Sequence, residues 1–491
     1  MCCIKQKSKR NWYRCICPKL VLYLAPSYIY TTLQYWSFNC FALGKIVITS
    51  TSQSDEQLRE RLLGLTRTDR DYWSFKGNSS REHSHGLFQY PAMMVPQVAR
   101  AVMEQACLVH PEIERVGDPF AGSGTILTES LLRGLSFSGT DINPLAVLLC
   151  RVKAGPFFID ALAEKVPQVI ARLEADMRND VEVNFVNRDK WFRPDVQIAL
   201  SKIRRAILRE NSLWARRFFW IGLAEAVRFT SNSRTSTYKL HVRLEDQIKA
   251  RSCDAAGIFK KAITRNLQHM RDQAEHLDKE GYLNRGRYSM RVDVTLGDTR
   301  RVEQSGLSDI VLTSPSYGDN ATTVPYGQYS YLSLQWMELS DIDPAANAEY
   351  LCSTHEIDAR SLGGSRRIKK AECDALADRS AALKCYLGRL KDQPADRANR
   401  VAAFFRDLDA CLNPMLNGLR PGGLLVWILG NRKVGGERMP LDSILSDLLA
   451  THQATLLCEL TRRISSKKMA SKNNIADTMT SEAILVMRKA V

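Results

Sequence analysis

The segment from Asp309 to Asn320, DIVLTSPSYGDN, is the strongest candidate for chemistry in the chain. An apolar strand ends here in Ser-Pro-Ser-Tyr, and ligands of α/β sheets bind at the carboxyl ends of strands. The Ser314 hydroxyl and the Pro315 carbonyl can accept hydrogen bonds, and the Tyr317 ring can stack on a planar group. Taken alone, the segment could also be a simple turn after a buried strand. Its meaning therefore depends on what precedes it in the chain.

A second segment, Asp118 to Thr125 (DPFAGSGT), lies where a predicted strand turns into a predicted helix. Gly122 and Gly124 let the backbone approach a ligand closely and present its amides. A Walker A phosphate loop is excluded, because no Gly-Lys-Ser/Thr follows the glycines. Asp141 ends the next predicted strand, 17 residues after Gly124. A carboxylate in that place can accept hydrogen bonds from both ribose hydroxyls of an adenosine.

Asp298 ends a third predicted strand and could receive the amino group of an adenine ring. Any one acidic residue at a strand end is commonly only a helix cap. Three of them in order, together with the glycine turn, predict a site for an adenosine-containing ligand.

These segments resemble the amino-methyltransferases of DNA, which carry a (Ser/Asp/Asn)-Pro-Pro-(Tyr/Phe/Trp) motif. The glycine turn and Asp141 match that family's cofactor motifs, and FQYPAMMVP, residues 88–96, resembles its segment over the methionine end of the cofactor. The match covers roughly residues 72–150 and 291–486. The resemblance implies S-adenosylmethionine as the cofactor. The residues that it implies for the cofactor are Tyr90, Pro91, Asp118, Pro119, Phe120, Gly122, Gly124, Thr125, Asp141 and Asp298.

The chemistry of this family explains the residue types of the catalytic segment. An exocyclic amine is a poor nucleophile because its lone pair is delocalised into the ring, and hydrogen bonds to acceptors localise that pair. By the resemblance, Ser314 Oγ and the Pro315 carbonyl are these acceptors, and Tyr317 stacks on a base flipped out of the duplex. A motif that begins with serine is typical of enzymes forming N4-methylcytosine. We therefore expect cytosine-N4 methylation of double-stranded DNA.

Three alternatives stay open at this point. The same chemistry could act on adenine N6, or on N2 of an RNA guanine. A non-catalytic DNA-binding protein with this fold is the third, because Ser316 stands where the family has a second proline, which would stiffen the loop. Methylation at cytosine C5 is excluded, since it needs a nucleophilic cysteine, normally after proline, and none of the 13 cysteines follows a proline.

The elements that must position these residues follow an α/β pattern. Residues 115–134 and 135–155 each read as a strand followed by a helix, and apolar strands return in the last third of the chain. We expect a Rossmann-like methyltransferase sheet with a largely helical, basic insertion. The predicted parts are an N-terminal extension, poorly structured or wrongly assigned, at 1–51, a cofactor-binding half at 52–155, the insertion at 156–290, and a catalytic half at 291–491 with a helical insertion at 339–413.

The charge of the chain favours a polyanionic partner. The 491 residues include 69 Lys and Arg against 53 Asp and Glu, a formal net charge of +16. Residues 202–251 hold 12 basic and 4 acidic side chains, an excess of 12 − 4 = +8. Within this stretch we predict that DNA contacts Arg234, Lys239, His241 and Arg243. A second basic cluster that could flank the DNA backbone comprises Arg462, Arg463, Lys467, Lys468 and Lys472. A cognate restriction endonuclease is an expected partner of such an enzyme.

The remaining features argue against metal and membrane. The 13 cysteines form no paired CxxC knuckles, and two histidines, His83 and His85, are too few for a metal site, so we predict no metal. Residues 20–44 lack charge but are interrupted by polar residues and Pro26, so we expect no membrane segment. The predicted location is the cytoplasm.

Overall fold

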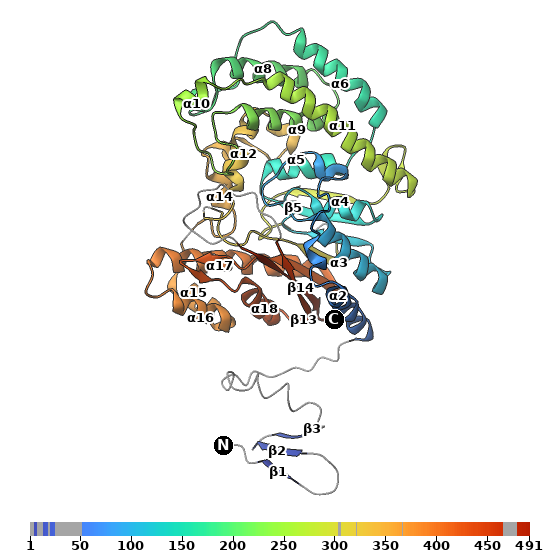
Figure 1. Cartoon of the computed structure of the whole chain (residues 1–491), viewed down its shortest axis with the longest axis vertical. Coiled ribbons are helices and arrows are strands. Elements are labelled where there is room, and N and C mark those ends of the chain that lie inside the picture. Colours follow the sequence, from blue (N-terminus) through green and yellow to red (C-terminus); the bar gives the residue numbers. More distant parts are fainter. Residues whose placement is uncertain are drawn as a thin grey trace. The chain divides into compact units, whose positions relative to one another are not determined.

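The computed structural model describes residues 52–302, 306–320, 322–365, 367–464 and 479–491, and three short strands before them. These strands form a three-stranded antiparallel sheet, and their bounds are β1 (Ile4–Gln6), β2 (Tyr13–Cys17) and β3 (Leu20–Leu24). The chain divides into a unit of residues 1–52 and a unit of residues 53–491 (Figure 1). Most of the uncharged stretch 20–44 lies outside the described residues. Among the described residues, no helix is both long and apolar enough to cross a membrane.

A seven-stranded sheet is the centre of the larger unit, in the order β13-β14-β10-β9-β4-β5-β8. All strands run in one direction except β14, which pairs antiparallel with both β10 and β13. Their bounds are β4 (Arg115–Asp118), β5 (Ser136–Asp141), β8 (Val292–Leu296), β9 (Ser308–Thr313), β10 (Leu419–Leu429), β13 (Ala454–Arg463) and β14 (Ser481–Lys489). The strand order reverses between β4 and β9, and ligands bind at such switch points.

Helices cover both faces of the sheet, which explains why its strands are continuous apolar runs rather than alternating ones. Along β9, Ile310 and Leu312 belong to one core cluster, whereas Val311 between them belongs to the other. The first cluster includes α2 (Gln53–Thr68), α3 (Pro96–Val109), α4 (Thr125–Leu131) and α5 (Pro144–Lys153). The second includes α15 (Lys370–Arg379), α16 (Ala381–Arg389), α17 (Ala395–Asn417) and α18 (Leu441–Thr451), which gather together in Figure 1.

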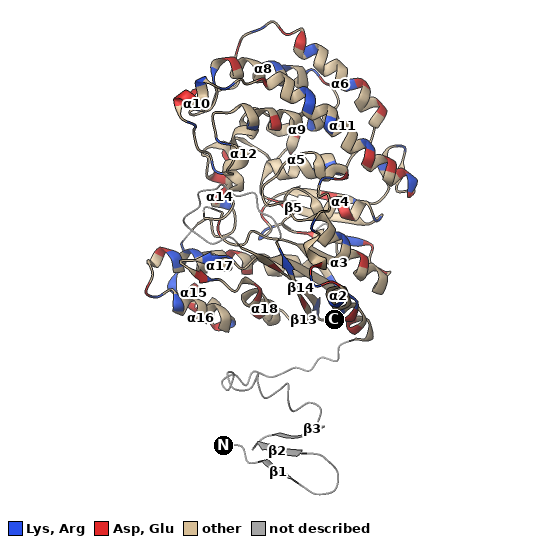
Figure 2. Ribbon diagram, viewed as in Figure 1, with Lys and Arg blue, Asp and Glu red and all other residues tan. Residues whose placement is uncertain are grey.

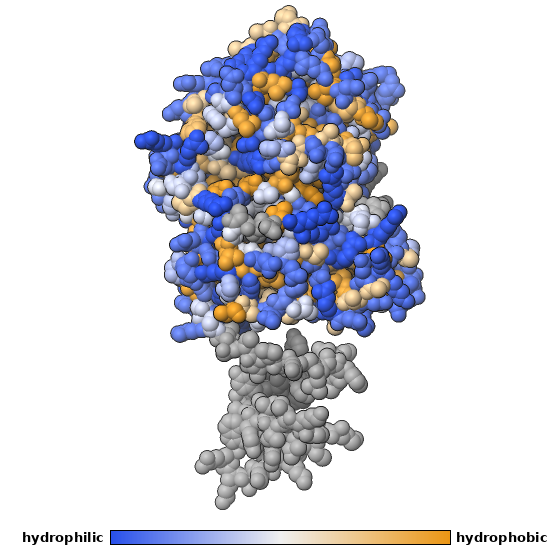
Figure 3. Space-filling model, turned by 180° about the vertical axis from the view of Figure 1, so that it is seen from behind, coloured by the Kyte–Doolittle hydropathy of each residue, from blue (hydrophilic) through white to orange (hydrophobic). Residues whose placement is uncertain are grey.

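The predicted insertion is largely helical and continues the first core. Its helices are α6 (Ile159–Glu174), α7 (Arg188–Trp191), α8 (Pro194–Leu208), α9 (Leu213–Thr230), α10 (Glu245–Lys249) and α11 (Ala255–Lys279). Apolar α9 side chains such as Phe219 and Trp220 are fully buried in that core. Basic side chains are spread over these helices with acidic ones among them (Figure 2). On the opposite face of the molecule, apolar side chains gather at mid-height between hydrophilic ones (Figure 3).

The structure confirms the predicted fold class, an α/β methyltransferase-like sheet with a largely helical insertion. Two details differ from the expectation. Strand β8 ends at Leu296, so Asp298 stands two residues beyond it. Strand β10 begins at Leu419 and contains a Pro-Gly-Gly sequence, although these residue types by themselves predict a turn. The register against β9 shifts between Leu419 and Leu424, so the Pro-Gly-Gly sequence forms an irregularity inside the strand.

Candidate active site

A cavity of about 520 Å³ opens at the carboxyl ends of β4, β5, β9 and β10, a size that suits a small-molecule ligand. It brings together the cofactor and catalytic segments, which the sequence separates by the whole insertion. Twelve of the predicted residues line it, namely Tyr90, Pro91, Asp118, Pro119, Phe120, Gly122, Thr125, Asp141, Asp298, Ser314, Pro315 and Tyr317. Gly124 is not among the lining residues. It is the N-cap residue directly before α4, with φ 72°, and a Cβ there would lie 3.0 Å from Cys150 Sγ.

The glycine turn is held by Asp141, the last residue of β5. One carboxylate oxygen of Asp141 accepts the Gly122 amide at 2.8 Å, and the other accepts the Asn143 amide at 2.8 Å. Gly122 has φ 51°, in the left-handed region that glycine adopts without strain. The turn therefore presents bare backbone to the cavity, beside a carboxylate that keeps further lone pairs for a ligand.

Asp118, at the end of β4, ties that strand to β9. Its Oδ1 accepts the Thr313 hydroxyl at 2.7 Å and the Phe120 amide at 3.1 Å. Burial raises the pKa of Asp118 to about 7 and that of Asp141 to about 6. The base of the cavity therefore holds two carboxyls that titrate near neutrality and whose ionised forms would be stabilised by a cationic ligand.

Asp298 lies on the cavity wall beside Arg300. Its carboxylate accepts hydrogen bonds from Arg300 Nε at 2.9 and 3.0 Å and from Nη2 at 2.6 Å. Burial acts to raise the pKa of Asp298, but these hydrogen bonds outweigh it and the net pKa is lowered. Arg300 is itself paired with Asp407 of α17 at 3.2 Å. If Asp298 contacts a ligand, it does so as an ionised carboxylate that Arg300 already holds. The sequence pattern did not reveal this role of Arg300.

The segment of residues 88–96, here called the lid, contacts the N-terminal ends of two helices. The Tyr90 hydroxyl accepts Asn143 Nδ2 at 2.9 Å, and Asn143 also caps α5 through the Leu145 amide. The Tyr90 ring stacks on Tyr326, the first residue of α12 (Tyr326–Gln335), with centroids 5.8 Å apart. Tyr90 and Tyr326 both line the cavity, so the lid and the helix after the catalytic loop form one wall.

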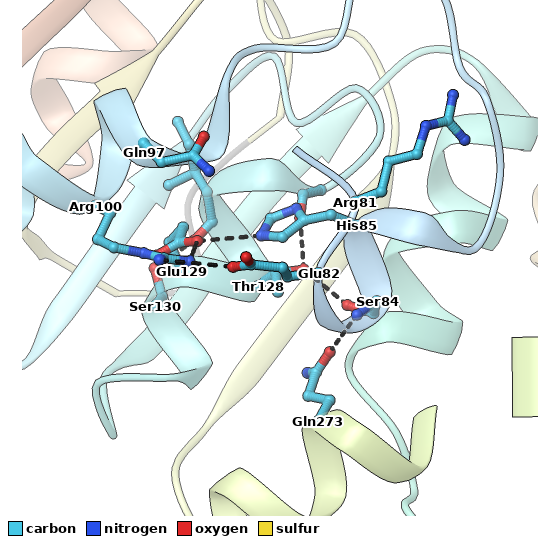
Figure 4. Close-up of polar contacts among 12 residues, drawn as sticks. Arg81, Glu82, Ser84, His85, Gln97, Arg100, Thr128, Glu129, Ser130 and Gln273 are labelled. Atoms are coloured by element: carbon cyan, nitrogen blue, oxygen red, sulfur yellow. Dashed lines mark hydrogen bonds and ion pairs between the residues drawn. The ribbon is translucent and has the colours of Figure 1, made fainter. Parts of the chain in front are cut away.

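A buried polar cluster joins the segment before the lid to α4 (Figure 4). His85, in the short helix η3 (His83–Gly86), places Nε2 at 3.1 Å from Glu129 Oε1. Arg100 and Arg133 also bind the fully buried Glu129 carboxylate, at 3.0 to 3.1 Å. Among the described residues, no group of three or more His, Cys, Asp or Glu side chains could hold a metal ion.

The predicted catalytic loop after β9 is held by hydrogen bonds from the Ser314 and Tyr317 hydroxyls. Ser314 Oγ donates to the backbone carbonyl of Ile428 on β10 at 3.0 Å. Tyr317 donates its hydroxyl proton to Glu482 of β14 at 3.1 Å, and the two hydroxyl oxygens lie 3.3 Å apart. Burial and the Glu482 charge raise the pKa of Tyr317 well above its usual value, so the hydroxyl stays protonated. Ser316, in place of the family's second proline, also lines the cavity.

Two further side chains at this end of the cavity were not anticipated. Asn320 is buried and donates Nδ2 to Asp358 at 3.2 Å, whereas its Oδ1 finds no hydrogen-bond partner among the described residues. A buried acceptor of this kind needs a donor, and a ligand amine in the cavity would supply one. The second unanticipated side chain is Glu482. In the sequence it can be recognised only as an acidic residue at the start of an apolar strand.

Comparison with known proteins decides the family. No protein-family model matches the chain. The chain is 30% identical over 463 residues to the type II methyltransferase M.MvaI of Kocuria varians, an alignment that covers 90% of this chain and 98% of that protein. The chain belongs to the type II methyltransferases. A segment of 105 residues is also 27% identical to the type II methyltransferase M.MjaII of Methanocaldococcus jannaschii, covering 21% of this chain and 19% of that protein.

Membership in this family supports a DNA methyltransferase with S-adenosylmethionine as its methyl donor. The cavity of this methyltransferase fits that cofactor in three respects. Its size suits an adenosyl ligand, the turn at Gly122 leaves backbone uncovered, and Asp118 and Asp141 supply negative charge for a sulfonium cation. Asn320 Oδ1, which has no hydrogen-bond partner among the described residues, is an acceptor that an amino group of a ligand could use.

The methyltransferase places its predicted DNA-contacting residues on a short loop rather than on a helix. The chain leaves α9 at Thr230, and Ser233 and Val242 form an antiparallel bridge that closes a hairpin between them. Arg234 and His241 are exposed on this hairpin, and Lys239 and Arg243 are partly buried at it. Leu240 donates its amide to Gln328 of α12 at 3.2 Å, so the hairpin is fixed to the helix whose first turn lines the cavity.

Positive charge gathers at the base of this hairpin. Arg243 is adjacent to Arg234 and Arg251, and burial together with these two charges lowers the pKa of Arg243. Its Nε has no hydrogen-bond partner within the described parts of the chain. The second predicted basic cluster is different. Arg462 is buried and ion-paired with Glu482, unlike a residue that flanks the DNA backbone, whereas Arg463 is exposed, and Lys467, Lys468 and Lys472 lie outside the described residues.

Proposed function

We propose that this type II methyltransferase transfers a methyl group from S-adenosylmethionine to N4 of cytosine in double-stranded DNA, with the target base flipped into the cavity. The hydrogen bond from Ser314 Oγ to the Ile428 carbonyl is the observation that carries the proposal. A hydroxyl has one proton and two acceptor positions. Because the proton is used by Ile428, Ser314 Oγ faces the cavity as an acceptor, which is what an exocyclic amine requires.

The roles of the catalytic residues follow from this arrangement. Ser314 Oγ and the Pro315 carbonyl accept one hydrogen bond each from the target amine. These hydrogen bonds localise the lone pair on the nitrogen instead of in the ring. The Tyr317 ring, held by Glu482, supplies the flat surface on which the flipped base stacks. When bound, S-adenosylmethionine supplies an electrophilic methyl group. Asp141 and Asp118 would hold the adenosine and sulfonium part of the bound cofactor, and the lining of the cavity would fix the amine relative to the methyl group.

The proposed DNA surface is the hairpin 233–242 with the arginines around it. A phosphate beside Arg234 and Arg243 would relieve the mutual repulsion that lowers the pKa of Arg243. Tyr238 of the hairpin packs against Tyr329 of α12 at 5.8 Å between centroids, and Arg228 lies 4.5 Å above the same ring. DNA held on this hairpin would lie over α12, next to the entrance of the target base.

The test is tritiated methyl transfer from S-adenosylmethionine to unmethylated DNA, followed by nucleoside analysis. Label in N4-methylcytosine supports the proposal, and label in N6-methyladenine replaces the base with adenine. Label that appears in RNA and not in DNA would favour guanine N2, and cofactor binding without any transfer would favour a non-catalytic DNA-binding protein. A Ser314→Ala variant should bind the cofactor normally and lose at least about a hundredfold in transfer rate. Ser340→Ala, at an exposed position, is the matched control.

A cognate restriction endonuclease and the cytoplasmic location stay predictions. The endonuclease is tested by asking whether an extract of the source cells cleaves unmethylated DNA but leaves the DNA of those cells intact. The location is tested by cell fractionation, which shows whether the enzyme is recovered with the cytoplasm.

A further inference from the structure

Glu482 is fixed at the active site by contacts with both of its carboxylate oxygens. Oε1 accepts the Tyr317 hydroxyl, and Oε2 is ion-paired with Arg462 Nη1. Arg462 and Glu482 are directly opposite one another in the antiparallel ladder of β13 and β14. Arg462 Nε is in turn held by the Trp73 carbonyl at 3.0 Å. Glu482 and Arg462 are only 14% and 9% exposed, and both line the cavity beside Ser314 and Tyr317.

The Ser314 and Tyr317 hydroxyls of the catalytic loop have one proton each, and each has an acceptor that cannot itself donate. The Ser314 proton goes to the Ile428 carbonyl and the Tyr317 proton to Glu482. The 3.3 Å contact between the two oxygens therefore has no proton of its own. If Glu482 ceased to be an acceptor, Ser314 Oγ would be the neighbouring acceptor for the Tyr317 proton. That hydrogen bond would occupy a lone pair that the target amine needs.

We propose that Glu482 is a positioning residue for methyl transfer, which keeps the Tyr317 proton directed away from Ser314 so that Ser314 Oγ stays an acceptor for the target amine. The inference rests on the proposed role of Ser314 in amine methylation. Glu482 acts through Tyr317, and its carboxylate needs no contact with the cofactor or the base. Arg462 sets the direction of this carboxylate, because it holds the other oxygen from the neighbouring strand.

The substitution Glu482→Gln tests this role with almost no change in shape. Arg462 is a donor, so it would keep its hydrogen bond to the amide oxygen of Gln. The amide NH₂ would then face Tyr317 and donate to the hydroxyl oxygen. The Tyr317 proton would turn towards Ser314. We expect the single-turnover rate of methyl transfer to fall by about tenfold or more, while the dissociation constants for S-adenosylmethionine and DNA change less than about twofold.

A second substitution separates this role from a merely structural one. Tyr317→Phe removes the competing proton and keeps the ring, so it should lose less activity than Glu482→Gln. The double variant should recover to the rate of Tyr317→Phe alone, because the proton that Glu482 controls is gone. If Glu482 only held β13 to β14, the double variant would be at least as impaired as Glu482→Gln, and the proposal would be wrong.

The outcomes also distinguish this inference from the proposed function. A Glu482→Gln variant with the wild-type rate, beside an inactive Ser314→Ala, would overturn the inference and leave the function standing. An active Ser314→Ala would overturn both. If Glu482→Gln does not fold, as judged by thermal unfolding, the Tyr317→Phe rate still decides. A loss as large as that of Ser314→Ala would show that the Tyr317 hydroxyl itself is required, contrary to the inference.

Discussion

The carboxylate of Asp141 accepts the backbone amide of Gly122 at 2.8 Å, so the acidic end of β5 holds the glycine turn at the end of β4. The two strands are parallel neighbours, and their ends lie at the same edge of the sheet. One residue therefore shapes the bare backbone of the turn and keeps lone pairs for a ligand above it.

Binding of S-adenosylmethionine should weaken as the pH falls below about 7. The pKa of Asp118 is about 7 and that of Asp141 about 6, both raised by burial, so mild acid makes these carboxyls neutral. The sulfonium favours the ionised carboxylates, so protons compete with the cofactor, and the dissociation constant should rise by up to about tenfold per pH unit for each carboxyl that is protonated. Isothermal titration calorimetry checks this. S-adenosylhomocysteine, which lacks the sulfonium charge, should show a weaker dependence, and equal pH profiles for the two ligands would contradict the explanation.

Asp141→Asn should impair cofactor binding more than folding. The amide nitrogen of Asn cannot accept the Asn143 or Gly122 amide, so one of these two hydrogen bonds is lost, along with the negative charge. We expect the dissociation constant for S-adenosylmethionine to rise by about tenfold to a hundredfold. Asp160→Asn, at an exposed position on α6, is the control and should bind normally. A normal affinity in the Asp141 variant would show that the turn does not depend on this carboxylate.

Arg243→Ala should reduce the salt dependence of DNA binding. A phosphate contact releases counterions, so its loss should lower the slope of log K against log salt by about one. Fluorescence anisotropy with a labelled duplex at several salt concentrations measures the slope. Arg178, which is exposed and ion-paired with Asp180 and Glu182, belongs to the same insertion and serves as the control. Identical slopes for the two alanine variants would place the DNA away from the hairpin.

Glu129→Gln should lower the free energy of unfolding by about 3–5 kcal/mol, because it leaves two arginines without their buried partner. Hydrogen bonds from His85 and Arg100 overcome the effect of burial and lower the pKa of Glu129 to about 2. Its contribution to stability is therefore present above the usual glutamate pKa and is lost as the pH falls towards 2. Urea denaturation of the variant and of Glu164→Gln, an exposed control on α6, measures the difference. Equal unfolding energies would mean that the cluster in Figure 4 does not stabilise the fold.

Much of the site follows from local sequence. Asp118, Asp141 and Ser314 come directly at or after short apolar runs, and parallel strands buried on both faces align their carboxyl ends at one edge. The sequence predicts that Arg234 and Arg243 lie on a surface that contacts DNA, but it does not predict that this stretch folds into a hairpin. A run of polar and basic residues between helices indicates only a surface, whereas the bridge between Ser233 and Val242 depends on packing against α12.

The motifs and their order can be read from the amino-acid sequence, because each depends on a few neighbouring residues. The hydrogen bonds that these residues make can be seen only once the chain is folded. Glu482 lies 165 residues after Tyr317, and it reaches the catalytic loop because β14 is inserted antiparallel between β10 and β13. The same pairing directs Arg462 to Glu482 rather than to the solvent. Strand register depends on the whole core, so no local pattern could show that a carboxylate would control the proton of Tyr317.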